Sequence, residues 1–443
     1  MKFQPYPKYK DSGVEWLGEV PSGWKVKRLK FCATEASNKV QARGSESFYI
    51  GMENIESWTG RYIPSESEVE GISNSFKAGN VLFGKLRPYL AKAFLTDFNG
   101  LCSSEFLVLN AKQVIPKYLI RYILSYEFIN QVDSSTYGTK MPRANWEFIG
   151  DLPIPIPTIL EQNTITNFLD RETRRIDALV EEKNHFIELL KEKRQALISQ
   201  AVTKGLDPTV KMKDSGVEWL GEVPEHWEVK RVKYIGEAII GLTYSPNDVV
   251  DSNGIIVLRS TNLKNGRINL ADTVNVISTI PKKLKLKTGD ILICSRNGSR
   301  NLIGKNALIT ANEEELTFGA FTTVLRSEYY QFIYFILNSS LFDYQAGMFL
   351  TTTINQLTTG TLNNFEIPFP PKIEQTSIAN FLNCETTKID ALIQETQTSI
   401  ALLKEHRTAL ISAAVTGKID VRDEVCQDTK RIGEIPCKHK NYI

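Results

Sequence analysis

Residues that could carry out catalysis are sparse in this sequence, and none falls into a pattern that a known reaction needs. Gly298–Asn306 looks like a phosphate-binding loop, but five residues separate its glycines instead of four, and Asn306 replaces the Ser or Thr that holds Mg²⁺. Only four histidines are present, and no HExxH or GxSxG motif occurs. We therefore expect no catalytic residues and no metal site in this chain.

Two basic and aromatic segments have instead the composition of a nucleic-acid contact. Gly84–Lys92 follows the strand-like run NVLF, and Ser295–Lys305 follows the strand-like run DILIC. Arg, Lys, Asn and Tyr on a loop after a strand suit phosphate binding and contacts with base edges. An ordinary solvated loop has the same composition, so both interpretations stay open.

A second pair of polar loops, Tyr137–Arg143 and Gly347–Asn355, lies at matching places further along the chain. The segment Pro281–Lys287 adds a basic strip without sequence preference. Together these loops give the candidate DNA-binding residues Lys85, Arg87, Tyr89, Lys92, Lys140, Arg143, Arg296, Asn297, Arg300, Lys305, Thr351 and Thr352.

Long helices must position these loops. Glu161–Thr203 contains no Pro or Gly, and its apolar residues recur in alternating four- and three-residue steps that predict the seam of a coiled coil. The predicted seam includes Leu179 and Phe186, and Gly205 marks the expected end of the helix. Such a helix needs a partner to bury its apolar stripe.

The partner lies in the same chain, because Glu374–Thr416 repeats Glu161–Thr203 with more than half of the positions identical. The eleven residues Asp11–Pro21 also recur without change at Asp214–Pro224, each copy followed by a Trp and a basic run. The segments 31–150 and 234–360 share only a plan of short strands and one helix. The duplication thus kept a frame and let two globular segments diverge, as a reader of two unlike half-sites would require.

The shared helix is expected over Pro116–Gln131 in the first segment and near Glu328–Gln345 in the second. Each segment closes with a proline run, Pro153–Pro157 or Pro368–Pro371, which we expect to be a stiff extended connector. In the repeated motif, Trp16 and Trp24 are interpreted as core anchors, with direct ligand contact as the alternative.

Composition is that of an ordinary globular protein, with 42% hydrophobic and 23% charged residues. The net charge is only +2, so any contact with nucleic acid must come from local basic faces. The six cysteines show no CxxC pairing and are interpreted as free thiols of a reducing cytosol. No apolar run approaches the length of a membrane span, and the first residues lack a signal sequence, so we expect a soluble cytoplasmic protein.

The charges of the repeated helices suggest a register for their antiparallel pairing. We place Glu172 and Arg194, with their repeats Glu385 and Arg407, on the apolar seams, where an unpaired charge is costly. One register sets Glu172 opposite Arg407 and Glu385 opposite Arg194. This register is a prediction of coiled-coil geometry that a structure can test.

The assembled features resemble the specificity subunit of a Type I restriction-modification system. The resemblance rests on DSGVEWLGEVP with its following Trp, on the proline run followed by Glu-Gln, and on LLKEKRQALISQAVTKGLD, each present in two copies. It implies an α+β fold in which two pseudo-symmetric mixed α/β target-recognition domains are joined by two long helices that form an antiparallel coiled coil.

The expected divisions are a first recognition domain (1–157), a first helix (158–207), a second recognition domain (208–371), a second helix (372–420) and a tail (421–443). Gly433–Pro436 in the tail looks like an eroded third copy of the repeated motif, and a disordered tail is the alternative.

The resemblance further implies that each recognition domain reads half of a bipartite double-stranded DNA target while the coiled coil sets the spacing. It implies no bound cofactor in this chain. Adenine methylation with S-adenosylmethionine would belong to two methyltransferase subunits, and ATP/Mg²⁺-dependent cleavage to restriction subunits. The remaining alternatives are a structural coiled-coil adaptor and a fused DNA methyltransferase/nuclease.

Overall fold

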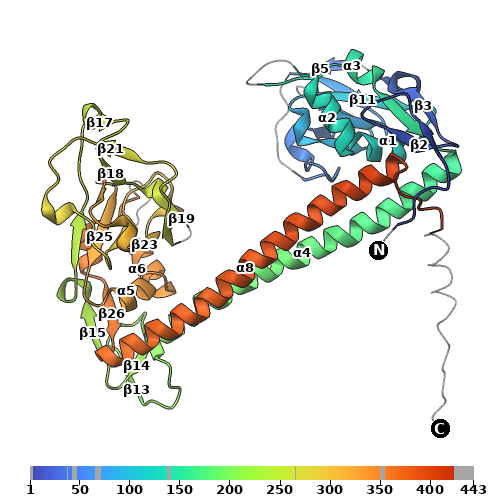
Figure 1. Ribbon diagram of the computed structural model, residues 1–443. Coiled ribbons are helices and arrows are strands. Elements are labelled where there is room, and N and C mark those ends of the chain that lie inside the picture. The colour runs from blue at the N-terminus through green and yellow to red at the C-terminus, as the bar shows by residue number, and fades with distance from the viewer. Residues whose placement is uncertain are drawn as a thin grey trace, which may run out of the picture. The chain divides into compact units, whose positions relative to one another are not determined.

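The computed structural model describes residues 3–36, 38–41, 47–64, 71–136, 141–264, 266–349 and 355–423 (Figure 1). Contacts divide the chain into two compact units: unit 1 is drawn from Met1–Lys183 and Gln397–Ile443, and unit 2 is Asn184–Thr396. The predicted bounds of the domains and of the tail stay predictions. The eroded third copy lies outside the described residues.

Two long helices, α4 (Ile159–Lys204) and α8 (Lys372–Val415), confirm the predicted helical repeats. Each helix contributes one part to unit 1 and the other part to unit 2. Both end at a glycine in the left-handed region, Gly205 with φ +75° and Gly417 with φ +76°. This conformation favours glycine and ends the helix in the expected way.

The helices pair in antiparallel fashion within each unit, but their register differs from the predicted one. Arg407 forms an ion pair with Asp177 in unit 1, and the repeated residue Arg194 forms one with Asp390 in unit 2. The predicted partners, Glu172 and Glu385, lie five positions earlier. The predicted pairs Glu172–Arg407 and Glu385–Arg194 are therefore wrong.

The reason is the identity of the seam residues. Thr173 and Thr386 are buried on the seam, where each hydroxyl donates to the carbonyl four residues earlier, at 2.7 Å in both cases. Glu172 and Glu385 instead pair with cations of their own helices: Arg171 and Arg175 for Glu172, and Lys388 for Glu385.

Two predicted seam residues of α4 also lie outside the seam. Leu179 and Phe186 are exposed, whereas Ile187 is buried. A satisfied threonine hydroxyl costs little in a helix interface, so the apolar pattern alone does not locate the seam.

The globular part of unit 1 is built on two four-stranded sheets. The first sheet is antiparallel and consists, in spatial order, of β4 (Ala33–Glu35), β11 (Phe106–Ala111), β8 (Val81–Gly84) and β9 (Ala93–Leu95). The second consists of β5 (Lys39–Gln41), β7 (Ile72–Phe76), β10 (Gly100–Ser103) and β6 (Tyr49–Ile50), with β10 and β6 parallel. Helices α1 (Pro116–Ile123), α2 (Tyr126–Ser134) and α3 (Trp146–Asp151) follow in the chain.

Unit 2 repeats the first sheet with the same order and directions. Its strands are β16 (Glu237–Ile240), β25 (Thr322–Arg326), β22 (Ile291–Cys294) and β23 (Asn306–Leu308). Helices α5 (Tyr330–Ile336), α6 (Ser340–Phe349) and α7 (Thr359–Asn363) follow. The predicted shared plan of the two globular segments is thus confirmed.

The second sheets differ between the units. In unit 2 the order is β17 (Val249–Val250), β21 (Val274–Val276), β18 (Ile255–Leu258) and β24 (Thr317–Phe318), with β18 and β24 parallel. The later strand of the parallel pair, β10, is central in unit 1, whereas its counterpart β24 is an edge strand in unit 2. A short pair, β19 (Leu263–Lys264) and β20 (Arg267–Ile268), is added.

The helix expected once in each segment is broken into two helices in both units. The breaks fall at Ser125 and Ser339, which are fully buried and donate their hydroxyls to carbonyls three residues earlier, at 2.6 Å in both cases. A serine that satisfies a local carbonyl competes with continued helix.

The proline runs are strands rather than unpaired connectors. β12 (Pro153–Ile156) pairs with β3 (Lys25–Arg28), and β26 (Glu366–Phe369) pairs with β15 (Glu228–Arg231), both antiparallel. Proline is tolerated here because each sheet has only two strands. The repeated eleven-residue motif supplies the turn and the second strand of a further hairpin in each unit. The paired strands are β1 (Tyr9–Asp11) with β2 (Glu19–Pro21), and β13 (Met212–Asp214) with β14 (Glu222–Pro224).

The tryptophan that follows this motif is a core residue in both units, which favours the packing interpretation. Trp24 and Trp227 are almost completely buried, whereas Trp16 is only partly buried. The indole Nε1 of Trp24 donates to Glu161 at 3.0 Å, and that of Trp227 donates to Glu374 at 3.1 Å. Each Trp thus joins a globular domain to the start of a long helix.

The buried core of each unit includes residues from both long helices. In unit 1, Ile165 and Leu169 of α4 and Ile411 of α8 belong to the same cluster as residues of the first sheet and of α1. In unit 2, Ile198 and Leu382 have the corresponding role. The fold is therefore α+β, with two pseudo-symmetric mixed domains joined by an antiparallel pair of long helices.

Candidate nucleic-acid interface

The two loops predicted to carry contact residues meet in unit 1. The first loop follows β8 and runs to β9, and the second precedes α3. Leu86 forms a β-bridge with Arg143, the Arg87 N–H donates to the Pro142 carbonyl at 2.8 Å, and the Ala144 N–H donates to the Lys85 carbonyl at 3.0 Å. Two segments more than fifty residues apart in sequence therefore present one continuous surface.

The corresponding loops meet in unit 2 in the same way. Arg296 forms a β-bridge with Gln356, and the Leu357 N–H donates to the Ser295 carbonyl at 2.8 Å. The Asn355 side chain also donates to the Gly298 carbonyl at 3.1 Å. The two units share this arrangement because β8 and β22 have equivalent places in their sheets. In both units the first loop connects the third strand of the sheet to the fourth.

In unit 1 the structure separates exposed candidates from structural ones. Arg87 and Tyr89 are exposed, and Arg87 has a left-handed backbone with φ +51°. Lys85 is half-buried. The Lys92 amine donates to the Met52 carbonyl at 2.7 Å, and burial lowers the pKa of Lys92. Lys92 therefore holds the loop in place.

Arg143 also has a structural contact. Its guanidinium donates to both carboxylate oxygens of Glu105, at 3.0 and 3.1 Å. This bidentate geometry is a strong form of charge-assisted hydrogen bond. It ties the second loop to the residue that precedes β11. Lys140 lies outside the described residues.

In unit 2 four predicted residues are placed on the joined loops. Arg296 is exposed, and its guanidinium carbon lies 5.3 Å from the centre of the Phe321 ring. The Asn297 amide donates to Ser260 at 3.4 Å, and Arg300 donates to the Gly347 carbonyl at 3.5 Å. Lys305 is exposed. Thr351 and Thr352 lie outside the described residues.

Sequence reasoning missed two residues at this surface, Glu105 and Phe321. Both stand immediately before the second strand of their sheet. Glu105 is distant in sequence from both loops, so no local pattern marked it as a partner of Arg143. No sequence pattern marked Phe321, because an aromatic residue before a strand is ordinarily assigned to the core.

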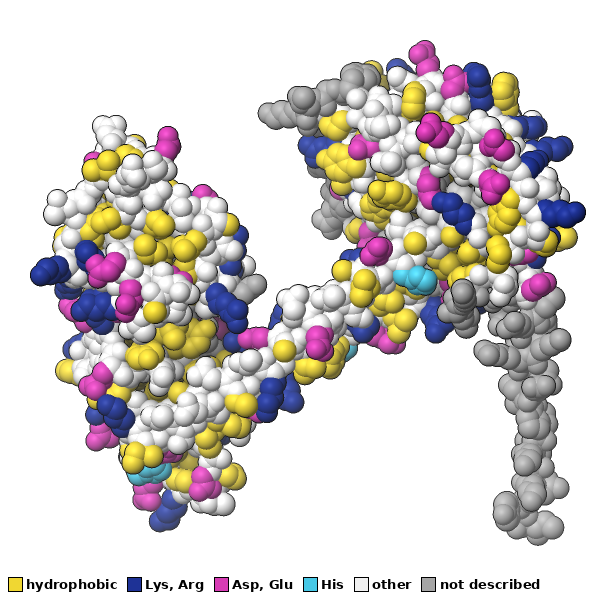
Figure 2. All heavy atoms as spheres, viewed as in Figure 1, with side chains coloured by type: hydrophobic (Ala, Val, Ile, Leu, Met, Phe, Trp, Pro, Cys, Tyr) yellow, Lys and Arg dark blue, Asp and Glu magenta, His cyan; other side chains and the backbone are white. Residues whose placement is uncertain are grey.

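The charges on the visible face of both units are mixed rather than of one sign. On the face shown in Figure 2, Lys and Arg side chains alternate with Asp and Glu over both units. The basic strip Pro281–Lys287 follows the same rule, because Lys283 pairs with Glu237 at 2.5 Å and Lys285 pairs with Glu315. Part of its predicted positive charge is therefore compensated within the chain.

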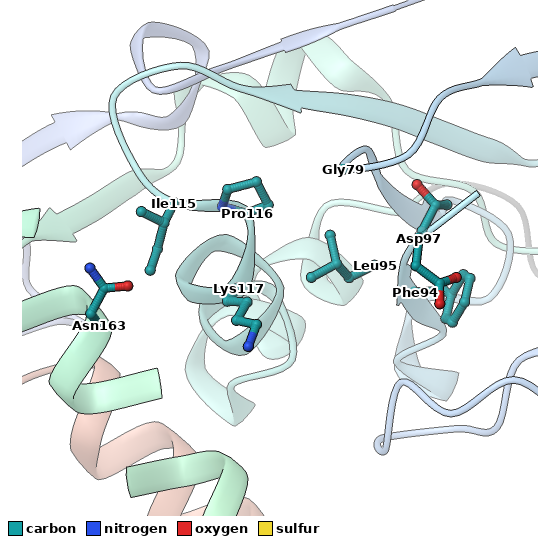
Figure 3. Close-up of a pocket in the computed structure, with 9 residues that line it drawn as sticks. Gly79, Phe94, Leu95, Asp97, Ile115, Pro116, Lys117 and Asn163 are labelled. Atoms are coloured by element: carbon teal, nitrogen blue, oxygen red, sulfur yellow. The ribbon is translucent and has the colours of Figure 1, made fainter. Parts of the chain in front are cut away.

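A pocket in unit 1 lies where β9, α1 and the start of α4 approach one another (Figure 3). Its volume is about 450 Å³, and Asp97, Lys117 and Asn163 are among its polar lining residues. Lys117 is also 3.6 Å from Asp170. The lining contains neither His nor Cys.

Within the described part of the chain, no group of three or more His, Cys, Asp or Glu side chains could hold a metal ion. Cys32, Cys102, Cys294 and Cys384 are free thiols. No described helix is long and apolar enough to cross a membrane.

Comparisons with known proteins agree on one family. The model of the Type I restriction modification DNA specificity domain matches residues 21–189 and 224–402, once for each half of the chain. The EcoKI specificity subunit of Escherichia coli is 30% identical over 207 residues, which cover 45% of this chain and 44% of that subunit. The MjaVIII specificity subunit of Methanocaldococcus jannaschii is 25% identical over 82% of this chain and 81% of its own length.

Solved structures show the same fold. A chain from a type I R-M system, studied for complex assembly and conformational transition, has a TM-score of 0.70 at 19% identity and covers 89% of this chain and 98% of its own length. The HsdS subunit of Thermoanaerobacter tengcongensis has a TM-score of 0.51 at 18% identity, covering 90% of this chain and 98% of its own length. The match to EcoKI spans less than half of that relative. The family model matches most of this chain, which therefore belongs to the family of Type I restriction-modification DNA specificity subunits.

Proposed function

We propose that this chain is the sequence-reading subunit of a Type I restriction-modification complex and that each unit reads one half of a bipartite double-stranded DNA target. The observation that carries this proposal is the paired-loop surface. It is built at the same place of the same sheet in both units, yet it presents different side chains in each. A shared frame with unlike contact residues is what two unlike half-sites require.

The exposed side chains of these surfaces have the chemistry that DNA contact needs. Arg87 and Tyr89 in unit 1, and Arg296, Arg300 and Lys305 in unit 2, offer donors and an aromatic face. Guanidinium groups suit both phosphate oxygens and the major-groove edge of guanine. Because acidic residues are interspersed, binding rests on these local groups rather than on a uniformly positive surface.

The paired helices act in this proposal as the spacer between the half-sites. Their register brings the repeated Arg–Asp pairs together, one in each unit. A helix rises about 1.5 Å per residue, so the length of α4 and α8 determines the separation that the spacer can span.

A second repeated feature of the helices suits the binding of partner proteins. Each unit exposes the same three apolar positions of the repeat, two from one helix and one from the other. These are Leu160, Leu179 and Leu402 in unit 1, and Ile373, Leu392 and Leu189 in unit 2. Equivalent exposed apolar positions on both units suit two copies of one partner.

We infer that these partners are two methyltransferase subunits, which hold S-adenosylmethionine and methylate adenine, and that ATP/Mg²⁺-dependent restriction subunits join the complex. Because its proposed ligand is double-stranded DNA, we infer that the chain acts in the cytoplasm. The chain itself supplies no cofactor site in this proposal.

The test is to purify the chain with its methyltransferase subunits and to map the methylated adenines in genomic DNA. A motif of two short defined segments separated by undefined bases is the expected result. A complex that assembles but does not protect a DNA segment in a footprinting experiment would favour a structural adaptor. Methylation by the purified chain alone would favour a fused enzyme.

A further inference from the structure

One position of the paired-loop surface differs in kind between the two units. Strand register makes Glu105 and Phe321 equivalent, because Phe106 faces Gly84 and Thr322 faces Cys294. The carbonyl of each residue accepts a hydrogen bond from the loop after the third strand, from Lys85 N–H at 2.9 Å and from Ser295 N–H at 3.1 Å. Unit 1 therefore has a carboxylate where unit 2 has an aromatic ring.

The two side chains make different contacts with arginine. Glu105 neutralises Arg143 through its bidentate ion pair. Phe321 remains 60% exposed at the protein surface, with Arg296 stacked over its ring. Among the described residues, no carboxylate forms an ion pair with Arg296. Unit 1 thus compensates Arg143 of its second loop, whereas Arg296 of the first loop in unit 2 has no ion-pair partner among the described residues.

The backbone holds this exposed pair in a fixed place. The Arg296 N–H donates to the Phe321 carbonyl at 3.0 Å, and the β-bridge to Gln356 holds the same residue from the other side. The loop that carries Phe321 is fixed by the Ala320 N–H, which donates to the Leu242 carbonyl at 2.9 Å, and by the Thr322 hydroxyl, which donates to the Gly319 carbonyl at 2.8 Å.

Among the described residues, no side-chain hydrogen bond engages the guanidinium of Arg296. A planar guanidinium that lies over an aromatic face is attracted by the ring quadrupole and presents its N–H donors at its periphery. Those donors match the O6 and N7 acceptors of guanine in the major groove, and an apolar ring suits the methyl group of thymine. An exposed Phe gains from burial only when a partner covers it.

We propose that Arg296 and Phe321 form a specificity-determining pair in the second recognition domain, an inference that rests on the proposed function. Arg296 donates to a guanine, and Phe321 contacts a thymine next to it in the half-site that unit 2 reads. Unit 1 has no equivalent pair, because Glu105 occupies the position of Phe321.

The test uses the complex of the full chain with its methyltransferase subunits. Binding is measured by competition between the genomic target duplex and duplexes with single base-pair changes. Arg296→Met, which keeps an apolar stem but removes all guanidinium donors, is expected to reduce discrimination at one G·C pair of one half-site by about 5- to 150-fold, the range for loss of a bidentate arginine–guanine contact. Phe321→Leu should weaken preference at the adjacent pair, and Phe321→Glu should remove the guanine preference by neutralising Arg296.

Tyr234 offers a matched control, since it is 71% exposed in unit 2 and has Lys233 over its ring at 5.0 Å, but lies outside the paired loops. Tyr234→Leu should leave discrimination at both half-sites unchanged. Melting temperatures should stay close to that of the unmodified complex, because both members of the proposed pair are exposed.

The outcomes separate this inference from the proposed function. An unmodified complex without preference for a bipartite duplex would overturn both. Clear bipartite preference that Arg296→Met and Phe321→Glu leave intact would overturn the pair alone. Equal relaxation of both half-sites would also overturn it, because that result indicates a general loss of DNA affinity.

Discussion

Removal of the carboxylate at Asp177 tests whether the paired helices are held in register by a buried charge. Arg407 is 6% exposed and Asp177 is 18% exposed, and their side chains meet at 2.9 Å. Arg407 also donates to the Trp58 carbonyl at 3.0 Å, so it joins the helices to the globular domain. Burial lowers the pKa of Arg407, and the Asp177 carboxylate opposes that effect.

The Asp177→Ala variant leaves a buried guanidinium without its counter-ion. Breaking a buried ion pair by removal of one partner costs about 3–5 kcal/mol of unfolding free energy. A domain of this size loses about 2–4 °C of melting temperature per kcal/mol, so the expected decrease is roughly 6–20 °C.

The second unit provides the matched control. Arg194 and Asp390 occupy the same positions of the repeat, but their side chains are 27% and 57% exposed and lie 3.2 Å apart. Because the Asp390 carboxylate is exposed and solvent reaches more of this pair, it contributes about 0–1 kcal/mol, so Asp390→Ala should change the melting temperature little.

Thermal unfolding followed by circular dichroism and calorimetry would measure both variants. Equal effects of Asp177→Ala and Asp390→Ala would refute the reasoning, since they would show that burial does not determine the cost. In the double variant Asp177→Ala/Arg407→Leu much of the stability should return, because no buried charge remains.

Three further predictions concern the proposed function. Exchange of residues 31–150 for another recognition domain should change one half of the methylated motif, whereas simultaneous change of both halves would contradict independent reading. Insertion of seven residues after Glu181 and after Gln394 keeps the heptad pattern, adds about 10.5 Å and should lengthen the spacer by about three base pairs; an unchanged spacer in the methylation map would exclude the helices as a ruler. Deletion of 425–443 should lower activity or melting temperature if the tail closes the repeat, and full retention of both would favour a tail without a structural role.

The sequence predicted the frame of the molecule well because repetition is visible without knowledge of the fold. Identical segments identified both long helices, and Gly205 marked the end of the first one. The register was predicted wrongly for a physical reason. A charged residue was assigned to the seam, whereas the chain buries Thr173, whose hydroxyl is satisfied by its own helix. Hydrogen bonds of this kind leave no periodic signal.

The candidate interface was predicted at the level of loops but not of side chains. Matching positions after β8 and β22 indicated the two surfaces, and the structure brings both loops together in each unit. It also shows that Lys92 and Arg143, two expected contact residues, have structural partners within the chain. Those partners, a carbonyl and a distant carboxylate, follow from tertiary packing and could not be inferred from composition.

The contacts that attach each globular domain to the helices explain why the domains could diverge so far. In unit 1, Trp24 donates to Glu161 of α4, and the backbone N–H of Tyr126 donates to Ser412 of α8 at 2.9 Å. In unit 2 the same contacts are made by Trp227 with Glu374 and by the Ser340 N–H with Ser199, at 3.0 Å for the latter pair.

Each domain thus has one contact of this repeated kind with each helix. The Trp lies outside the divergent segment, and the other contact on the domain side is a backbone amide that any residue except proline supplies. A recognition domain can therefore change nearly all of its side chains without loss of either contact. This is the physical reason to expect that exchange of residues 31–150 preserves assembly while it alters one half-site. An exchanged chain that no longer forms the complex, although its Trp24 and Ser412 are intact, would show that attachment depends on further side chains of the domain.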